Sequence, residues 1–134
     1  STQGVSSAAS DVYKRQDVLR LMDQVGHPNL GHVLDTGQYA GSPGASGFAD
    51  DTLREQHDYL ASVRLTAPRA TYVRAKLYRI STGVEEWLDY DQIFSVLRRV
   101  EYNGWVSLVY EGEDDALDVI PLGVRFLRGY LSAS

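Results

Sequence analysis

The amino-acid sequence predicts an α/β fold in which parallel strands alternate with helices. Short apolar runs are separated by longer segments whose apolar residues recur at helical spacing, and clusters of Gly, Pro, Asn and Ser stand between them. Such alternation is typical of parallel β-α units. The chain has 134 residues, of which 43% are hydrophobic and 23% charged, so it is long enough for one ordinary domain with a core.

Helices and strands are expected in a regular order along the chain. The expected strands are 30–36, 71–80 and 105–111. The expected helices are 17–25, 50–65, 89–102 and a last one after residues 112–117. An Asp opens the second helix, Asp89 or Asp91 opens the third, and Gly104 closes the third. The last helix carries apolar residues at helical spacing, namely Val119, Ile120, Val124, Leu127 and Leu131.

The composition disfavours several classes of protein. There are no cysteines, which excludes disulfides, thiolate metal sites and a cysteine nucleophile. The net charge of −5 disfavours a nucleic-acid binder, and no apolar run approaches the length that spans a bilayer. Neither a P-loop nor a GxGxxG motif occurs, so nucleotide binding loses its usual support. We expect a cytoplasmic protein that binds neither nucleic acid nor membrane.

Two architectures fit three strand-helix units. In a barrel, right-handed crossovers place all helices on one side of the curling sheet. A flavodoxin-like open sheet would have helices on both faces and usually more strands. The absence of nucleotide-binding motifs and the small number of strands make the curling, barrel-like sheet the favoured interpretation.

Four local patterns together resemble the xylose isomerase-like TIM barrel superfamily, which includes sugar phosphate isomerases and epimerases. They are GHPNLGHVLDTGQY (26–39), APRATYVRAKLYRI (67–80), DYDQIFSVLRRVEYNGWVSLVYEG (89–112) and IPLGVRFLRGYL (120–131). The resemblance covers residues 17–131. It implies a partial (β/α)8 TIM barrel with about three C-terminal β-α units and parallel strands. The three strands would correspond to strands six, seven and eight of the family's barrel.

A full barrel of this kind has eight strands and about 250 residues. The resemblance therefore implies that residues 17–134 are the C-terminal part of an isomerase-like domain, without the metal-binding glutamate of strand five. Open sheet edges favour pairing with another chain, so a homo-oligomer is considered. Residues 1–16 are small and polar, and SSAASDVYKRQ resembles a scar at the ends of assembled environmental sequences. We expect them to be a disordered or non-native tail.

Asp35 is the strongest candidate for a site residue. It ends a predicted strand before a Gly-rich loop, and barrel enzymes place functional groups at the carboxyl ends of strands. The resemblance implies that Asp35 binds a divalent metal, Mg²⁺ or Mn²⁺, with Zn²⁺ as a further candidate. The alternative is an Asp whose side chain caps the following turn.

Glu111 is predicted to be both a second metal ligand and a catalytic base. The family's metal-binding glutamate usually falls at the position of Val109, and Glu111 lies two residues further along the same face. The alternative is that Glu111 only lines the mouth of the barrel.

Two basic residues share one face of the strand 71–80. Lys76 matches a family lysine and is predicted to be catalytic, stabilising an enediolate or a phosphate. Arg74 stands where relatives often have His and is predicted to bind substrate, because Arg binds anionic and hydroxylated groups but is no base. The alternative is that the side chains of Arg74 and Lys76 are solvated or ion-paired at the end of the strand and have no role in the site.

Two loop residues complete the predicted site. Gln38 stands where many relatives have His and is predicted to hydrogen-bond the substrate. Trp87 follows the second strand and is predicted to wall a sugar site, although packing of the loop explains it too. The histidines are expected outside the site, with His27 structural, His32 facing away from Asp35 and His57 on a helix surface.

The resemblance implies a sugar or sugar-phosphate isomerase or epimerase that transfers protons with the help of a metal. Its partner would be a small carbohydrate, and this chain alone would be inactive. Two alternatives stay open. The first is a non-catalytic sugar-binding barrel that has lost its metal, which would explain why Gln38, Arg74 and Val109 stand where relatives have metal-site or substrate-site residues. An enzyme similar to abasic-site endonucleases would need several His and Asp metal ligands, which the three histidines do not supply.

Overall fold

The computed structural model describes residues 18–42 and 58–132. Three strands form one parallel sheet in the order β1-β2-β3: β1 (His32–Asp35), β2 (Ala70–Leu77) and β3 (Trp105–Tyr110). The helices that alternate with them are α4 (Tyr59–Thr66), α5 (Tyr90–Arg99) and α6 (Ala116–Leu131), and a 3₁₀ turn, η2 (Ala67–Arg69), leads into β2. Residues 18–25 are also helical, as predicted, while the predicted tail 1–16 lies outside the described residues.

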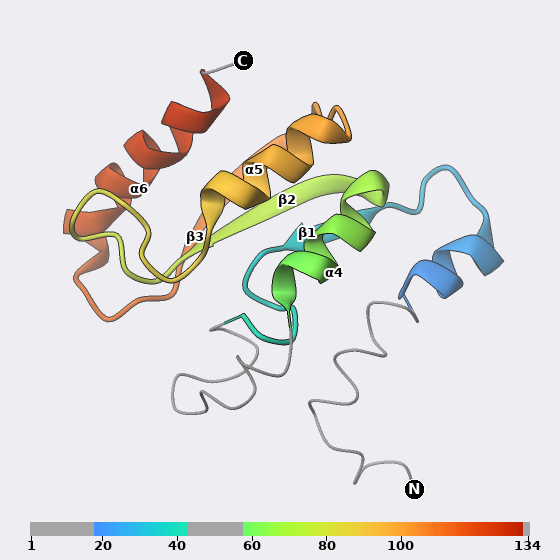
Figure 1. The fold of residues 1–134 in the computed structure, drawn as a ribbon, viewed down its shortest axis with the longest axis horizontal. Coiled ribbons are helices and arrows are strands. Elements are labelled where there is room, and N and C mark those ends of the chain that lie inside the picture. Colours follow the sequence, from blue (N-terminus) through green and yellow to red (C-terminus); the bar gives the residue numbers. More distant parts are fainter. Residues whose placement is uncertain (1–17, 43–57, 133–134) are drawn as a thin grey trace, which may run out of the picture.

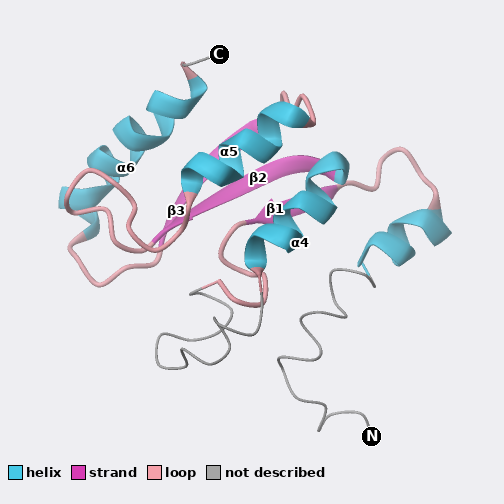
Figure 2. Cartoon of the chain, viewed as in Figure 1, coloured by secondary structure: helices cyan, strands magenta, loops and turns pink. Residues whose placement is uncertain are grey.

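All three labelled helices cover the same face of the sheet (Figure 1; Figure 2). On this face Leu34, Val73, Ala75 and Leu77 are at most 1% exposed. Helix α6 also packs here, because a Cβ at Gly123 would lie 2.6 Å from Leu77 Cδ1. The predicted α/β class with parallel strands is confirmed, and among the described residues no helix covers the other face, as a flavodoxin-like sheet would require.

The opposite face of the sheet carries an apolar row and a polar row. Val33, Tyr72 and Trp105 are partners in the strand register and are 47%, 37% and 81% exposed. The next row on the same face consists of Asp35, Arg74 and Ser107. In a closed barrel this face lines the interior, and the polar row lies toward the carboxyl ends of the strands.

Two element boundaries differ from the prediction because side chains capture backbone N–H groups. Strand β2 ends at Leu77 rather than at residue 80, since Glu85 Oε2 accepts hydrogen bonds from Tyr78 N (2.8 Å) and Arg79 N (3.1 Å). Helix α4 begins at Tyr59, because Asp58 has an extended backbone and its side chain accepts from Leu60 N. The remainder of the predicted helix, 50–57, lies outside the described residues.

Helix α5 begins as predicted but ends differently. Asp89 is its N-cap and accepts from Gln92 N at 3.1 Å. The predicted closure at Gly104 is wrong: Glu101 takes the left-handed conformation, with φ of 56°, and Tyr102 N donates to Leu97 O at 2.9 Å. This is the bond pattern that usually places glycine after the last helical residue.

Replacing Glu101 with glycine is expected to stabilise the protein by about 0.5 to 1 kcal/mol, because glycine adopts the left-handed conformation without the steric cost of a Cβ. Urea-induced unfolding followed by circular dichroism measures the change. The control Glu101→Ala removes the same charge but keeps the Cβ, so an equal gain in that variant would contradict the backbone explanation.

The helices bury only part of their apolar residues. In α6 the buried residues are Val119, Gly123 and Leu127, whereas Ile120 and Leu131 are 40% and 52% exposed. The close contact at Gly123 sets which side of α6 meets the sheet. No helix in the described part of the chain has the length and apolar character needed to cross a membrane.

Candidate functional site

Two ion pairs join neighbouring strands at the carboxyl end of the sheet. Arg74 Nη1 of β2 lies 3.3 Å from Asp35 Oδ2 of β1. Two residues further along β2, the Lys76 ammonium pairs with the carboxylate of Glu111, the residue that directly follows β3. Parallel register places these groups at one edge, so four of the predicted site residues come together there.

The two carboxylate oxygens of Asp35 face different partners. Oδ1 accepts a hydrogen bond from Gly37 N at 3.0 Å and so caps the turn that follows β1. Oδ2 is buried and has no hydrogen-bond partner, although the Arg74 guanidinium is close to it. Asp35 therefore does what the turn-capping alternative expected, and its second oxygen is directed at a cation.

The Lys76–Glu111 pair is asymmetric in its exposure. The Lys76 side chain is 2% exposed, whereas that of Glu111 is 42% exposed. Gly37 packs against the lysine, since a Cβ there would lie 2.6 Å from Lys76 Cγ. Burying a charged lysine is costly unless it is paired, so Glu111 holds the ammonium in place while remaining accessible itself.

A buried polar network fixes the backbone of β2 beneath this pair. Thr36 Oγ1 accepts from Lys76 N at 2.9 Å and lies 3.0 Å from the hydroxyl of Tyr90, which donates to Lys76 O at 2.6 Å. Burial raises the pKa of Tyr90 well above its ordinary value, so the hydroxyl stays protonated as a donor. Sequence reasoning missed Thr36 and Tyr90; a hydroxyl directly after the strand-ending Asp35 was the only available signal.

The other two predicted residues lie in loops near this edge. Gln38 is exposed, and its N–H contacts Asp35 O at 3.3 Å. Trp87 stacks on Tyr78, with ring centroids 5.8 Å apart, and the Arg79 guanidinium lies 5.1 Å from its ring centre. The structure thus places Trp87 in a stack with Tyr78 and Arg79, where it lines the same pocket as Gly112.

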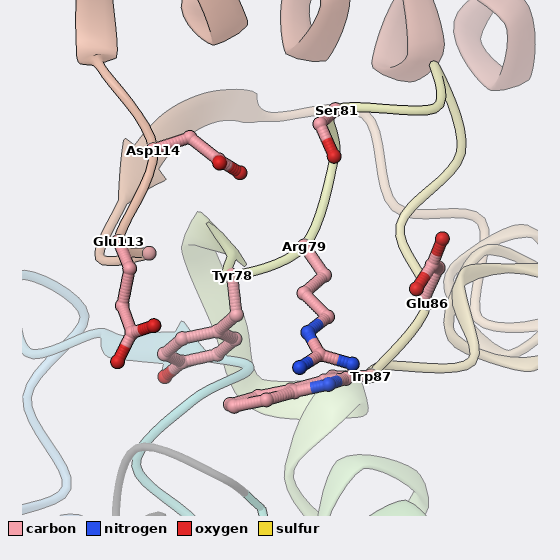
Figure 3. A pocket seen from close by; sticks show the side chains of 8 residues that line it. Tyr78, Arg79, Ser81, Glu86, Trp87, Glu113 and Asp114 are labelled. Carbon is pink, nitrogen blue, oxygen red and sulfur yellow. The ribbon is translucent and has the colours of Figure 1, made fainter.

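A pocket of about 410 Å³ opens between the loops that follow β2 and β3. Figure 3 shows Tyr78, Trp87 and Arg79 on one side of it and the acidic residues Glu113 and Asp114 on another. Its walls carry more acidic than basic side chains, and it reaches Gly112, the residue after Glu111, so the space next to Glu111 is lined mainly by negative charge.

The histidines lie apart from the ion pairs where the structure describes them. His32 Nε2 lies 3.0 Å from the hydroxyl of Tyr39, which lies 2.7 Å from Thr66 Oγ1 of α4. Because Thr66 donates to Ser62 O, Tyr39 donates to Thr66 and the neutral His32 ring donates through Nε2. His27 Nδ1 accepts from Asn29 N in the turn before β1, and His57 lies outside the described residues.

Acidification is expected to destabilise the protein through His32. Burial lowers the pKa of His32 from 6.5, so the unfolded chain takes up the proton first and the free energy of unfolding falls as the pH drops below about 6.5. Urea unfolding between about pH 7.5 and pH 5 measures this slope. His32→Gln keeps an N–H donor that does not titrate, and an unchanged slope in that variant would rule His32 out as the cause.

The residues at this edge do not fit a divalent metal. Within residues 18–42 and 58–132 no group of three or more His, Asp or Glu side chains could hold one. Both predicted ligands, Asp35 and Glu111, are already paired with cations that would repel a metal ion.

Residues 6–130 match a family model, that of the xylose isomerase-like TIM barrel. The chain belongs to this family. The match covers all three strands and begins ahead of the predicted boundary at residue 17. A search of curated proteins finds no match. Xylose isomerase-like barrels often depend on a metal, so the paired carboxylates of this member depart from the usual pattern, whereas the position of the charged groups at the strand ends follows the barrel rule.

Proposed function

We propose that this chain is part of a sugar or sugar-phosphate isomerase or epimerase whose substrate is a small carbohydrate. The observation that carries the proposal is the Lys76–Glu111 ion pair, which combines a buried ammonium with an accessible carboxylate at the carboxyl end of the sheet. Proton transfer beside a carbonyl requires a base that reaches the C–H proton and a hydrogen-bond donor that reaches the carbonyl oxygen, and this pair supplies one of each.

The proposed chemistry uses the two groups in separate roles. The Glu111 carboxylate takes the proton from the carbon next to the carbonyl, so the C–H electrons form a C=C bond and the carbonyl oxygen gains negative charge. The Lys76 ammonium stabilises that oxygen. In an isomerase the proton of the hydroxyl group on the adjacent carbon then passes to this oxygen, and Glu111 returns its proton to the former carbonyl carbon, so the carbonyl moves by one position; in an epimerase the proton returns to the carbon from which it came. In metal-dependent relatives a divalent ion polarises the carbonyl; Asp35 and Glu111 are paired with cations, so no step is assigned to a metal here.

A non-catalytic sugar-binding barrel is the second candidate. The pairing of both carboxylates favours it, because charges that neutralise each other can shape a binding surface without taking part in proton transfer. In that case Arg74 and Gln38 would contact sugar hydroxyls without any proton transfer.

Deuterium exchange separates the two candidates. The full-length protein is incubated in D₂O with aldoses, ketoses and their phosphates, and NMR follows deuterium at the carbon beside the carbonyl. We expect exchange with at least one sugar, reduced by about 100-fold or more in Glu111→Gln. The matched control Asp23→Asn changes an exposed acid that pairs with Arg69 away from this edge, and it should leave the rate unchanged. Sugar binding without any exchange would favour the non-catalytic barrel and contradict the isomerase.

A further inference from the structure

The charges at the carboxyl edge of the sheet balance within the protein itself. Asp35 and Glu111 contribute two negative charges, and Arg74 and Lys76 contribute two positive ones. Each carboxylate contacts one cation from β2, the strand between the other two. A ligand that enters between β1 and β3 therefore meets no net charge on these four groups.

The same ion pairs disfavour binding of a divalent cation. A metal ion such as Mg²⁺ needs about six oxygen ligands in near-octahedral geometry. Oδ1 of Asp35 is engaged by Gly37 N, and Oδ2 faces the Arg74 guanidinium at 3.3 Å. A metal at Glu111 would have to displace or approach the Lys76 ammonium, which is buried and has Glu111 as its counter-charge.

The surroundings disfavour an anionic ligand as well. The pocket that reaches Gly112, next to Glu111, is lined by the acidic residues Glu86, Glu113 and Asp114. Among its lining residues the one cation is Arg79, whose guanidinium lies over the ring of Trp87. A phosphate group would meet this negative field, whereas hydroxyl groups can donate to the carboxylates and accept from the guanidinium and ammonium.

We infer that this site takes an uncharged polyhydroxylated ligand without a divalent metal, with Arg74 and Lys76 supplying the positive charge that a metal supplies elsewhere. The inference rests on the proposed function and narrows it from sugars and sugar phosphates to unphosphorylated sugars. It also turns the predicted metal ligands into hydrogen-bond acceptors for hydroxyl groups.

The test measures metal and sugar binding separately on the full-length protein. Electron paramagnetic resonance follows free Mn²⁺ during titration, and calorimetry compares D-fructose with D-fructose 6-phosphate, and D-xylulose with D-xylulose 5-phosphate, in EDTA and in excess Mg²⁺. We expect Mn²⁺ to stay free, and at least one neutral sugar to bind in EDTA with its affinity unchanged by Mg²⁺. Its phosphate should bind no more tightly. Arg74→Gln should weaken sugar binding by about tenfold.

Asp23→Asn is the matched control, because Asp23 forms an Arg–Asp pair with Arg69 (2.7 Å) away from this edge. Stoichiometric Mn²⁺ binding that is lost in Asp35→Asn but kept in Asp23→Asn would overturn the inference. So would a phosphate preference of about tenfold or more that Arg74→Gln abolishes. Either result would leave the isomerase proposal standing, whereas absence of binding and of deuterium exchange with every sugar would end both.

Discussion

Glu111→Gln is expected to lower the free energy of unfolding by about 3 kcal/mol, because it leaves the Lys76 ammonium buried without a counter-charge. The value is at the lower end of what breaking a buried pair costs, since Glu111 is itself 42% exposed and water can replace part of its contact. Urea unfolding at neutral pH measures the loss.

Lys76→Met is the matched comparison for this effect. Methionine has a similar length and carries no charge, so it fills the same space and should change stability by less than about 1.5 kcal/mol. The double variant Lys76→Met/Glu111→Gln should then resemble Lys76→Met alone. Equal losses for Glu111→Gln and for the exposed Asp23→Asn would show that the ammonium does not depend on Glu111.

Thr36→Val is expected to cost about 2 kcal/mol, although the two side chains have nearly the same shape. Valine leaves Lys76 N without its acceptor and removes the contact with the Tyr90 hydroxyl, at a position that is fully buried. Amide hydrogen exchange should be faster at Lys76 than at its neighbours in β2, and urea unfolding gives the total loss.

Thr71→Val, in β2, provides the control. Thr71 is exposed and its hydroxyl makes only a long contact of 3.4 Å with His32 O, so this change should stay within about 0.5 kcal/mol. If both variants were equally stable, the network around Lys76 would contribute nothing to holding β1 against β2.

The sequence predicts the order of strands and helices well because that order follows from periodicity alone. Alternation correctly places Arg74 and Lys76 on one face of β2, opposite the buried Val73 and Leu77. Where boundaries were wrong, the cause is a contact that periodicity does not encode. The carboxylate of Glu85 ends β2 early, and the left-handed Glu101 ends α5 without a glycine.

The pairing within the site could not be predicted from the sequence. Strand-end position identifies Asp35 and Glu111 as candidates, but the partner of each depends on the register between strands. The prediction that Asp35 and Glu111 bind one metal ion named no side-chain partner for either carboxylate, whereas the structure pairs Asp35 with Arg74 and Glu111 with Lys76. Register is set by how the helices and turns pack across the whole sheet, which no local pattern records.

The two tryptophans of the chain have opposite environments, and this gives the molecule two optical reporters. Trp105 lies at the amino end of β3 and is 81% exposed on the uncovered face, so its fluorescence should be red-shifted and readily quenched by iodide. Trp87 lies beyond the carboxyl end of β2, stacked between neighbours. Any protein segment that covers the apolar row would shift the emission of Trp105, whereas a ligand in the pocket would alter that of Trp87. Single Trp→Phe variants would therefore separate the two events in one spectrum.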